Sequence, residues 1–483
     1  MRSFFTNKSN LGKLMILIGV ITLVPTVVIP FYFSAESQFF FAFLIPSLSS
    51  IAAGLAACIV PIKKIHGRGF SYNLRRASLT VLFAWFYGTF LGAIPFLFLG
   101  EINYIQCLFE SASGWSTAGL SVLNVETLPH VFLFHRSFMQ FCGGLGFVLV
   151  MITLIQNRHA MSLYSFEGHD QVTPSVVKTA RTIFALYMSI FLVGALLYII
   201  CGMNPFDSVI HSMSALSTGG FSTKAGSIGE YNSVAYEAVT IVIMLLGMTN
   251  FAVLVLLVRR KFRQAGKVSE VRLGGIILGA AAVMAVLGLY FSSTLSFGDS
   301  VRHGVFNTVS FMSTTGYTSM EHTALPPFVF LLMFILVFIG GGSGSTSSGL
   351  KLNRVYLLLR GAGLNLKNRM SPKSQVSVAY YYNAQGKTVI DDALLKDTYA
   401  FLALYLITFF TTALLLTLTA GASITDALFE SASLITAVGL SSGIFDAAAN
   451  AGTLFVGILG MLIARLEITI LVTGFFSVAG TKR

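Results

Sequence analysis

Long runs of apolar residues, separated by short polar segments, dominate the chain. A helix that crosses a bilayer needs about 20 mostly apolar residues. Runs of this kind cover residues 14–33, 41–62, 77–99, 182–202, 235–258, 274–292, 327–341 and 398–420. Two weaker runs, 131–155 and 452–478, are interrupted by Arg136 and Arg465. The pattern predicts an all-α polytopic membrane protein with about ten transmembrane helices.

Four shorter apolar segments, each followed by a glycine-containing phrase, lie between the long runs. The segments are too brief to span a bilayer and cover residues 104–115, 205–216, 301–312 and 424–435. The phrases STAGLS, STGGFS, STTGYT and TAVGLS follow them and align on Gly119, Gly220, Gly316 and Gly439. A polar residue stands nine positions before each glycine: Glu110, His211, Asn307 and Glu430. We therefore predict four copies of one unit, consisting of a helix, a re-entrant pore helix, a glycine loop and a second helix.

The predicted repeats divide the chain into five parts. A leading transmembrane helix pair occupies residues 1–75. Four pseudo-symmetric pore repeats follow at residues 76–160, 175–260, 270–362 and 390–483. Two crossings in each part give ten transmembrane helices, with four re-entrant pore helices arranged around one ion pathway.

Four glycine loops at membrane depth indicate a route for an ion. Non-helical backbone inside a bilayer is tolerated only where it is buried in protein or lines a water-filled cavity. A ring of loops presents backbone carbonyls, which replace the hydration shell of an alkali cation. Glycine fits the anchor position because it adopts positive φ and lets carbonyls approach closely. We expect a selectivity filter where the four loops converge.

The basic residues predict the orientation of the chain. Charged residues make up 10% of the sequence and mean hydropathy is +0.79, as expected when lipid is the main solvent. Of the 31 Lys and Arg residues, 27 lie in segments that share one predicted side. By the positive-inside rule this side is cytoplasmic, and both termini lie on it. The net charge of +12 is a topology signal, because no soluble basic domain is available to bind nucleic acid.

The acidic residues favour a cation as the substrate. Twelve Asp and Glu residues, against Lys224 and Arg302, are predicted to face outward or to sit in re-entrant segments. A negative entrance concentrates cations and raises their rate of entry. The sequence offers no nucleophile–base set and no metal-ligand spacing, so we assign no catalytic residue and do not expect an enzyme.

A glycine- and serine-rich stretch, residues 340–349, is predicted to break a helix in mid-membrane. Its poor helix formers are Gly340, Gly341, Gly342, Ser343, Gly344, Ser345 and Gly349. Small residues of this kind either pack helices closely or form a flexible loop that plugs a pore.

Two arginines interrupt apolar runs. A charge that faces lipid is costly, so Arg465 is expected to face the pore or to pair with a neighbour. Glu467 is two positions away and points to a different face, which makes it a poor partner. Arg136 lies near the outer end of its predicted helix and is expected to snorkel.

The glycine loops, together with the phrase ARLEITILV at residues 464–472, resemble the Trk/Ktr/HKT superfamily of potassium transporters, in particular its TrkH-type membrane subunit. The resemblance covers essentially the whole chain, including the leading helix pair. It implies a K+ filter and no covalent cofactor. Glycine in all four loops resembles the potassium-selective members, whereas a serine in the first loop is associated with sodium permeation in plant relatives. The implied filter carbonyls belong to Thr117, Ala118 and Gly119; Thr218, Gly219 and Gly220; Thr314, Thr315 and Gly316; and Ala437, Val438 and Gly439.

The resemblance also implies how transport is controlled. Residues 340–349 would form an intramembrane gating loop, and Arg465 would act as a barrier below the filter. Members of the family are dimers in the bacterial plasma (inner) membrane. They dock on cytosolic nucleotide-binding regulatory subunits (TrkA-like), for which the basic loops 259–272 and 351–374 are plausible contacts.

Two alternatives stay open at this point. The same fold could carry Na+, or K+ coupled as a symporter to Na+ or H+. The second alternative is a secondary transporter of a small solute, in which the glycines merely pack helices. It is disfavoured because such transporters are often built from two inverted halves, whereas the four predicted units share one orientation.

Overall fold

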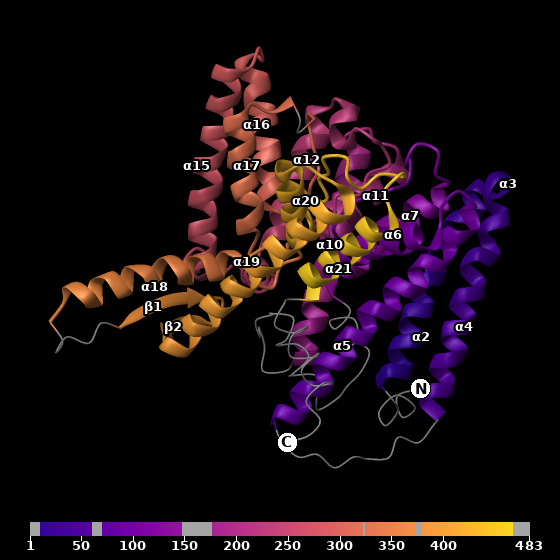
Figure 1. Ribbon diagram of the computed structural model, residues 1–483, viewed down its shortest axis with the longest axis horizontal. Helices are drawn as coiled ribbons and strands as arrows, with labels where there is room; N and C mark the ends of the chain where they lie inside the picture. The colour runs from indigo at the N-terminus through magenta and orange to yellow at the C-terminus, as the bar shows by residue number, and fades with distance from the viewer. Residues whose placement is uncertain (1–9, 60–69, 147–175, 322–323, 373–377, 467–483) are drawn as a thin grey trace.

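The computed structural model describes residues 10–59, 70–146, 176–321, 324–372 and 378–466. These residues form a helical body from which one two-stranded hairpin projects sideways (Figure 1). The expected all-helical architecture therefore holds except for this hairpin, β1 (Ala379–Asn383) and β2 (Gly386–Ile390). Its strands pair antiparallel, with Tyr381 opposite Thr388.

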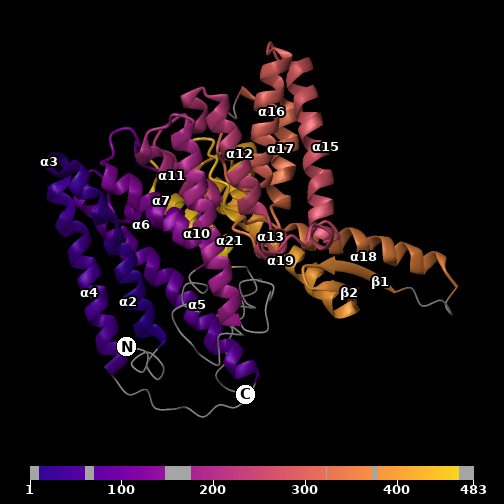
Figure 2. The same cartoon turned by 180° about the vertical axis from the view of Figure 1, so that it is seen from behind.

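The leading segment folds back on itself as two helices side by side (Figures 1 and 2). These are α2 (Asn10–Leu23) and α4 (Phe40–Ile59), joined by η1 (Val24–Tyr32), α3 (Phe33–Glu36) and η2 (Ser37–Phe39). Gly12 and Gly54 meet so closely that a Cβ on Gly12 would lie 2.6 Å from the Gly54 carbonyl oxygen. Small residues permit this approach between helices in lipid.

Four short helices lie where re-entrant segments are predicted. They are α6 (Tyr104–Ser116), α11 (Pro205–Leu216), α16 (Phe297–Met312) and α20 (Ile424–Thr436). Each begins at an Asn or Ser whose side chain accepts a hydrogen bond from a backbone N–H of the first turn: Asn103, Asn204, Ser296 and Ser423. Such residues are the preferred helix N-caps, so the sequence fixes where each helix starts.

Longer helices flank the four short ones. In chain order they are α5 (Phe70–Ala93) with η3 (Ile94–Leu99), α7 (His130–Leu145), α10 (Val176–Ile200), α12 (Val234–Met248), α15 (Ser269–Ser292), α17 (Pro327–Ile339), α19 (Asp392–Ala420) and α21 (Ala451–Leu466). The remaining elements are η4 (Ser227–Tyr231), α13 (Phe251–Val258), α14 (Phe262–Ala265) and α18 (Leu352–Met370).

Several of these helices can cross a membrane by length and composition. In the described part of the chain, five segments qualify: Leu11–Ile59, Leu79–Leu99, Lys178–Ile200, Ser269–Ser292 and Asp392–Ala420. A bent pair adds a sixth, and Pro327–Ile339 and Ala451–Leu466 are apolar but shorter. The first segment contains two antiparallel helices, α2 and α4. The chain is therefore a polytopic membrane protein. Parts of two of the ten expected spans, 131–155 and 452–478, lie outside the described residues.

The predicted span 235–258 is not one straight helix. α12 and α13 meet at an angle of 109°. Thr249 is extended, and the Asn250 side chain caps α13 by accepting from the Ala252 N–H at 2.8 Å. Apolar periodicity cannot reveal such a bend, because both halves are equally hydrophobic.

Candidate functional site

The four glycine loops share one backbone conformation. The residue two positions before each anchor glycine has a left-handed φ of 50–60°: Thr117, Thr218, Thr314 and Ala437. The anchors Gly119, Gly220, Gly316 and Gly439 have φ of 76–84°. A left-handed threonine is uncommon, and such residues persist only where the surroundings impose them.

The same hydrogen bonds end each short helix. The N–H groups of Ala118, Gly219, Thr315 and Val438 each donate to the carbonyl of a serine five positions earlier, at 2.9–3.1 Å. These acceptors are Ser113, Ser214, Ser310 and Ser433. The repeated sequence phrase therefore encodes a repeated helix end, and this holds in the fourth loop despite its Ala and Val.

The four loops close into a ring. A Cβ built on Gly119 would overlap the carbonyl oxygen of Gly219 in the second loop. Gly220 stands in the same relation to Thr315 and Gly316 to Val438, and Gly439 returns to Ala118. Each loop thus touches the next in chain order and the fourth touches the first. Any side chain at these glycines would push a neighbouring carbonyl out of place.

A polar side chain ties each short helix to the segment that leaves its loop. Ser121 donates to the Glu110 carboxylate at 2.7 Å, and the Val122 N–H donates to it at 2.6 Å. The other three copies repeat the contact between the polar residue nine positions before the glycine and a serine after it: His211 with Ser222, Asn307 with Ser319, and Glu430 with Ser441. The four polar positions found in the sequence therefore brace the four loops.

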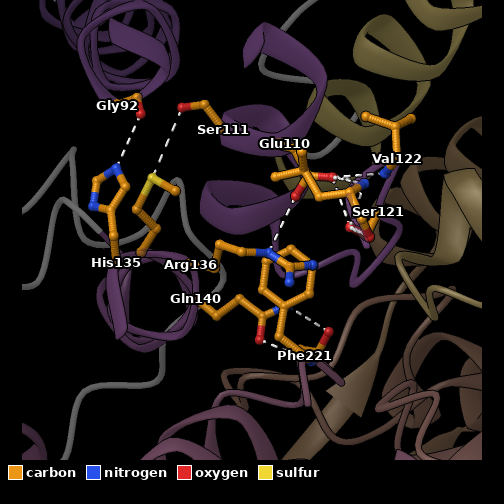
Figure 3. Close-up of polar contacts among 12 residues, drawn as sticks. Gly92, Glu110, Ser111, Ser121, Val122, His135, Arg136, Gln140 and Phe221 are labelled. Carbon is orange, nitrogen blue, oxygen red and sulfur yellow. Dashed lines mark hydrogen bonds and ion pairs between the residues drawn. The ribbon is translucent and has the colours of Figure 1, made fainter. Parts of the chain in front are cut away.

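The two glutamates of this set differ in their charge balance. Glu110 forms an ion pair with Arg136 of α7, whose Nε lies 3.2 Å from Oε2 (Figure 3). Within the described residues, no Lys or Arg lies within ion-pairing distance of Glu430, and its Oε2 has no hydrogen-bond partner. The expectation that Arg136 snorkels is wrong, because its side chain is 2% exposed.

Four of the twelve outward acids are buried rather than solvated: Glu36, Glu110, Glu237 and Glu430. Glu36 accepts from the backbone N–H groups of His130 and Val131 at 2.6 and 2.9 Å. Glu237 pairs with Arg302 at 2.8 Å. These carboxylates therefore hold loops and helix ends together.

The Gly/Ser loop (residues 340–349) breaks its helix as predicted. α17 ends at Ile339, and the next helix, α18, begins at Leu352. The loop fills the bend between α12 and α13, where the Gly342 N–H donates to the Met248 carbonyl at 2.8 Å. The Phe251 N–H in turn donates to the Gly344 carbonyl at 3.2 Å. Backbone groups left without helical partners at the α12–α13 bend and in the Gly/Ser loop therefore hydrogen-bond to each other.

The Gly/Ser loop also contacts the underside of the ring. The Thr346 hydroxyl donates to the carbonyl of Leu216, the last residue of α11, at 2.9 Å. The Ser348 N–H donates to the Thr314 hydroxyl at 3.0 Å. Between the loop, α19 and α21 lies a cavity of about 30 Å³, room for about two water molecules.

Arg465 joins the Gly/Ser loop to the first repeat. Its Nη1 donates to the Thr346 carbonyl at 3.0 Å. Its Nη2 donates to the carbonyls of Gly143 and Gly144 at 2.6 and 2.8 Å. The arginine thus pairs with neighbouring carbonyls, as one of the two expectations for it required. Glu467 lies outside the described residues.

On the cytoplasmic side of its predicted topology, Glu270 links the Gly/Ser loop to the hairpin. The Ser343 N–H donates to Glu270 at 3.0 Å, and Asn250 donates to the same carboxylate at 2.8 Å. The adjacent Ser269 hydroxyl accepts from the Tyr382 N–H of β1 at 2.9 Å. No motif marks Glu270 in the sequence, because these partners lie 20 and 73 residues away.

The structure therefore brings all the predicted site residues into two adjacent layers. The twelve loop residues form the ring, and the Gly/Ser loop with Arg465 lies against it. Three residues that contact these layers carry no signal in the sequence: Thr346, Glu270 and Gln140 of α7, whose Nε2 donates to the Gly219 carbonyl. In the described residues no group of three or more His, Cys, Asp or Glu side chains could hold a metal ion.

Comparison with known proteins gives a consistent result. The family model described as "TrkH: Cation transport protein" matches residues 50–273 and 280–478. An uncharacterised cation transporter of Methanocaldococcus jannaschii is 28% identical over 466 residues, 95% of this chain and 92% of that one. The Trk system potassium uptake protein TrkH of Halomonas elongata is 26% identical over 481 residues, covering 96% and 97% of the two chains.

A solved structure has the same fold. The crystal structure of the potassium transporter TrkH from Vibrio parahaemolyticus superposes with a TM-score of 0.84 at 26% identity. The match covers 98% of each chain.

Proposed function

Because the chain belongs to the TrkH family of cation transport proteins, a family of transporters and not of enzymes, we propose that it takes up potassium ions through a channel-like pore. The carbonyls of the four glycine loops are the filter in this proposal. The observation that carries it is the closed ring, in which four loops with one backbone conformation meet glycine to carbonyl. Such a ring offers a dehydrated alkali cation oxygen ligands from four sides.

The direction of transport follows from charge. We place the chain in a bacterial inner membrane with both termini on the cytoplasmic side, so that the basic segments face the cytoplasm. The membrane potential then drives K+ inward with about 2.3 kcal/mol per charge per 100 mV.

The Gly/Ser loop is the gate of this pore. It lies against the ring, its backbone pairs with the α12–α13 bend, and Arg465 holds Thr346 in place. Opening requires these bonds to break together, so a regulator must supply free energy. We assign that role to cytosolic nucleotide-binding subunits acting on a homodimer. The hairpin is hydrogen-bonded to Ser269, and the next residue, Glu270, accepts from the Ser343 N–H. A regulator that moves the hairpin would therefore also move the Gly/Ser loop.

A second candidate function keeps the pore and adds proton coupling. The observation in its favour is Glu430, a buried carboxylate beside the fourth loop with no basic partner among the described residues. Its protonation would change the charge next to the ion path, whereas Arg136 already balances Glu110.

The test is radioactive Rb+ uptake into proteoliposomes that hold the purified chain, with K+ or Na+ as competitor and empty liposomes as control. Uptake blocked by K+ but not by Na+, with Na+ competition appearing in Gly119→Ser, supports the K+ filter. Equal competition by both ions in the wild type rejects potassium selectivity. Uptake that rises with an imposed inward proton gradient, and loses that dependence in Glu430→Gln, supports the coupled alternative.

A further inference from the structure

One carbonyl of the ring is held by a side chain from another repeat. The Nε2 of Gln140 donates to the carbonyl oxygen of Gly219 at 2.6 Å. The Oε1 of the same amide accepts from the Phe221 N–H at 3.2 Å. Gln140 is fully buried on α7 of the first repeat, whereas Gly219 and Phe221 belong to the second loop (Figure 3). Both ends of a single amide thus bracket the anchor glycine of the second loop.

Phe221, directly after that glycine, is fixed on its other sides as well. The guanidinium of Arg136, one helical turn before Gln140, lies 4.0 Å from the centre of the Phe221 ring. The Tyr317 hydroxyl, from the third loop, donates to the Phe221 carbonyl at 2.9 Å. Arg136 also pairs with Glu110, which braces the first loop. One face of α7 therefore sets the first and second loops relative to each other.

The other three carbonyls at the same position of the ring differ from the Gly219 carbonyl in their hydrogen bonding. They belong to Ala118, Thr315 and Val438, and in the part of the chain that the structure describes none of them accepts a side-chain hydrogen bond. The ring is four-fold in its backbone but not in the electrostatics of its oxygens. A carbonyl that already accepts a short hydrogen bond carries a weaker field toward a cation than one that does not.

We propose that Gln140 is a positioning residue that sets the choice between K+ and Na+. The amide fixes the Gly219 carbonyl and shares its oxygen with the ion, and this inference rests on the proposed filter. Discrimination between the two cations depends on the number, the placement and the field strength of the carbonyl ligands. A strong field favours the smaller Na+. Weakening one of four ligands, while preventing it from moving inward, therefore favours K+.

The test compares three variants with the wild type in the full-length protein. Gln140→Met keeps the length of the side chain and removes both hydrogen bonds. Gln140→Leu also removes both hydrogen bonds and fills the site with a branched apolar side chain. The matched control is Ser111→Ala, which deletes an equally buried hydrogen bond, 2.7 Å to the Thr89 carbonyl, without touching any loop. The measurement is the K+ to Na+ permeability ratio from reversal potentials in planar bilayers.

The proposal expects the ratio to fall by about fivefold to tenfold in both Gln140 variants, the effect of roughly one net hydrogen bond, with total cation current retained. Ser111→Ala should keep the wild-type ratio. A wild-type ratio in a folded Gln140→Met or Gln140→Leu protein, or an equal fall in Ser111→Ala, overturns the proposal. Should Gln140→Met fail to fold, Gln140→Leu decides alone. A wild type that conducts no K+-selective current instead refutes the proposed function, so the two failures are distinguishable.

Discussion

Arg465 donates a hydrogen bond to the carbonyl of Thr346 across 119 residues of sequence, at 3.0 Å. The same guanidinium donates to Gly143 and Gly144 at the end of α7. The positively charged guanidinium of Arg465 therefore holds the Gly/Ser loop next to the ring that we propose as a cation filter. The arrangement explains why a costly charge is kept in an apolar helix: it fastens the Gly/Ser loop to a different repeat.

Arg465→Gln should release the loop. Glutamine cannot donate to three carbonyls at once, so the loop loses charge-assisted bonds worth about 1.5–3 kcal/mol each. Rb+ uptake into proteoliposomes without any regulatory subunit should rise by about tenfold or more, because 1.4 kcal/mol corresponds to about a factor of ten. The control is Arg360→Gln, an exposed position on α18. Unchanged or reduced uptake in Arg465→Gln would refute its role as a latch.

Thr346→Val should open the gate in a second, independent way. The hydroxyl donates to the carbonyls of Leu216 and Gly247 at 2.9 and 2.8 Å, and valine keeps its shape without the donor. We expect faster Rb+ uptake with the same K+ to Na+ preference, since the ring itself is untouched. The matched control is Thr417→Val, because the Thr417 hydroxyl makes an exposed hydrogen bond of 2.8 Å to the Leu414 carbonyl within α19. A change in selectivity instead of rate would mean that Thr346 acts on the filter.

Glu110 and Glu430 occupy equivalent positions but should respond differently to neutralisation. Glu110→Gln leaves Arg136 buried without its carboxylate, and breaking a buried pair costs about 3–5 kcal/mol. Glu430→Gln keeps an acceptor for Ser441 and Ser442 and leaves no cation behind. Thermal unfolding in detergent should therefore show a large fall of the midpoint for Glu110→Gln and a small shift for Glu430→Gln. Equal shifts would show that the Arg136 pair contributes nothing beyond the brace to the serine.

Gly119→Ala should abolish selective transport. Its φ of +81° disfavours alanine, and the new methyl group would overlap the Gly219 carbonyl oxygen. We expect Rb+ uptake to lose its K+ preference or to cease. Gly275→Ala, in α15 with open space around it, should behave as the wild type and gain slightly in helix propensity. K+-selective uptake at the wild-type rate in Gly119→Ala would contradict the placement of the filter.

The sequence predicts the repeated part of the site, the four glycine loops. Four glycines with matching flanks mark the loops, because the same helix end and the same brace are encoded four times. The break at residues 340–349 is also visible, since glycine and serine are poor helix formers in any context. Local composition is sufficient for both features.

What the sequence does not predict depends on contacts between distant residues. Arg136 is expected at the surface, yet it is buried because Glu110 and Phe221 provide a charge and a ring around it. The bend after Met248 follows from a loop almost 100 residues later that supplies its missing hydrogen bonds. Gln140 is a polar residue within an apolar run, and Gly219, whose carbonyl it binds, is 79 positions away. Periodicity carries no information about such pairs.

We propose above that the ring of glycine loops conducts K+ in preference to Na+. The most direct measurement is the reversal potential across a planar bilayer with K+ on one side and Na+ on the other. It should be made for the wild type and for a variant with residues 340–349 shortened. We expect a reversal potential displaced in the direction of K+ selectivity, and the same displacement with a larger current in the shortened variant. A reversal potential at zero, or no current even after the loop is shortened, would contradict it.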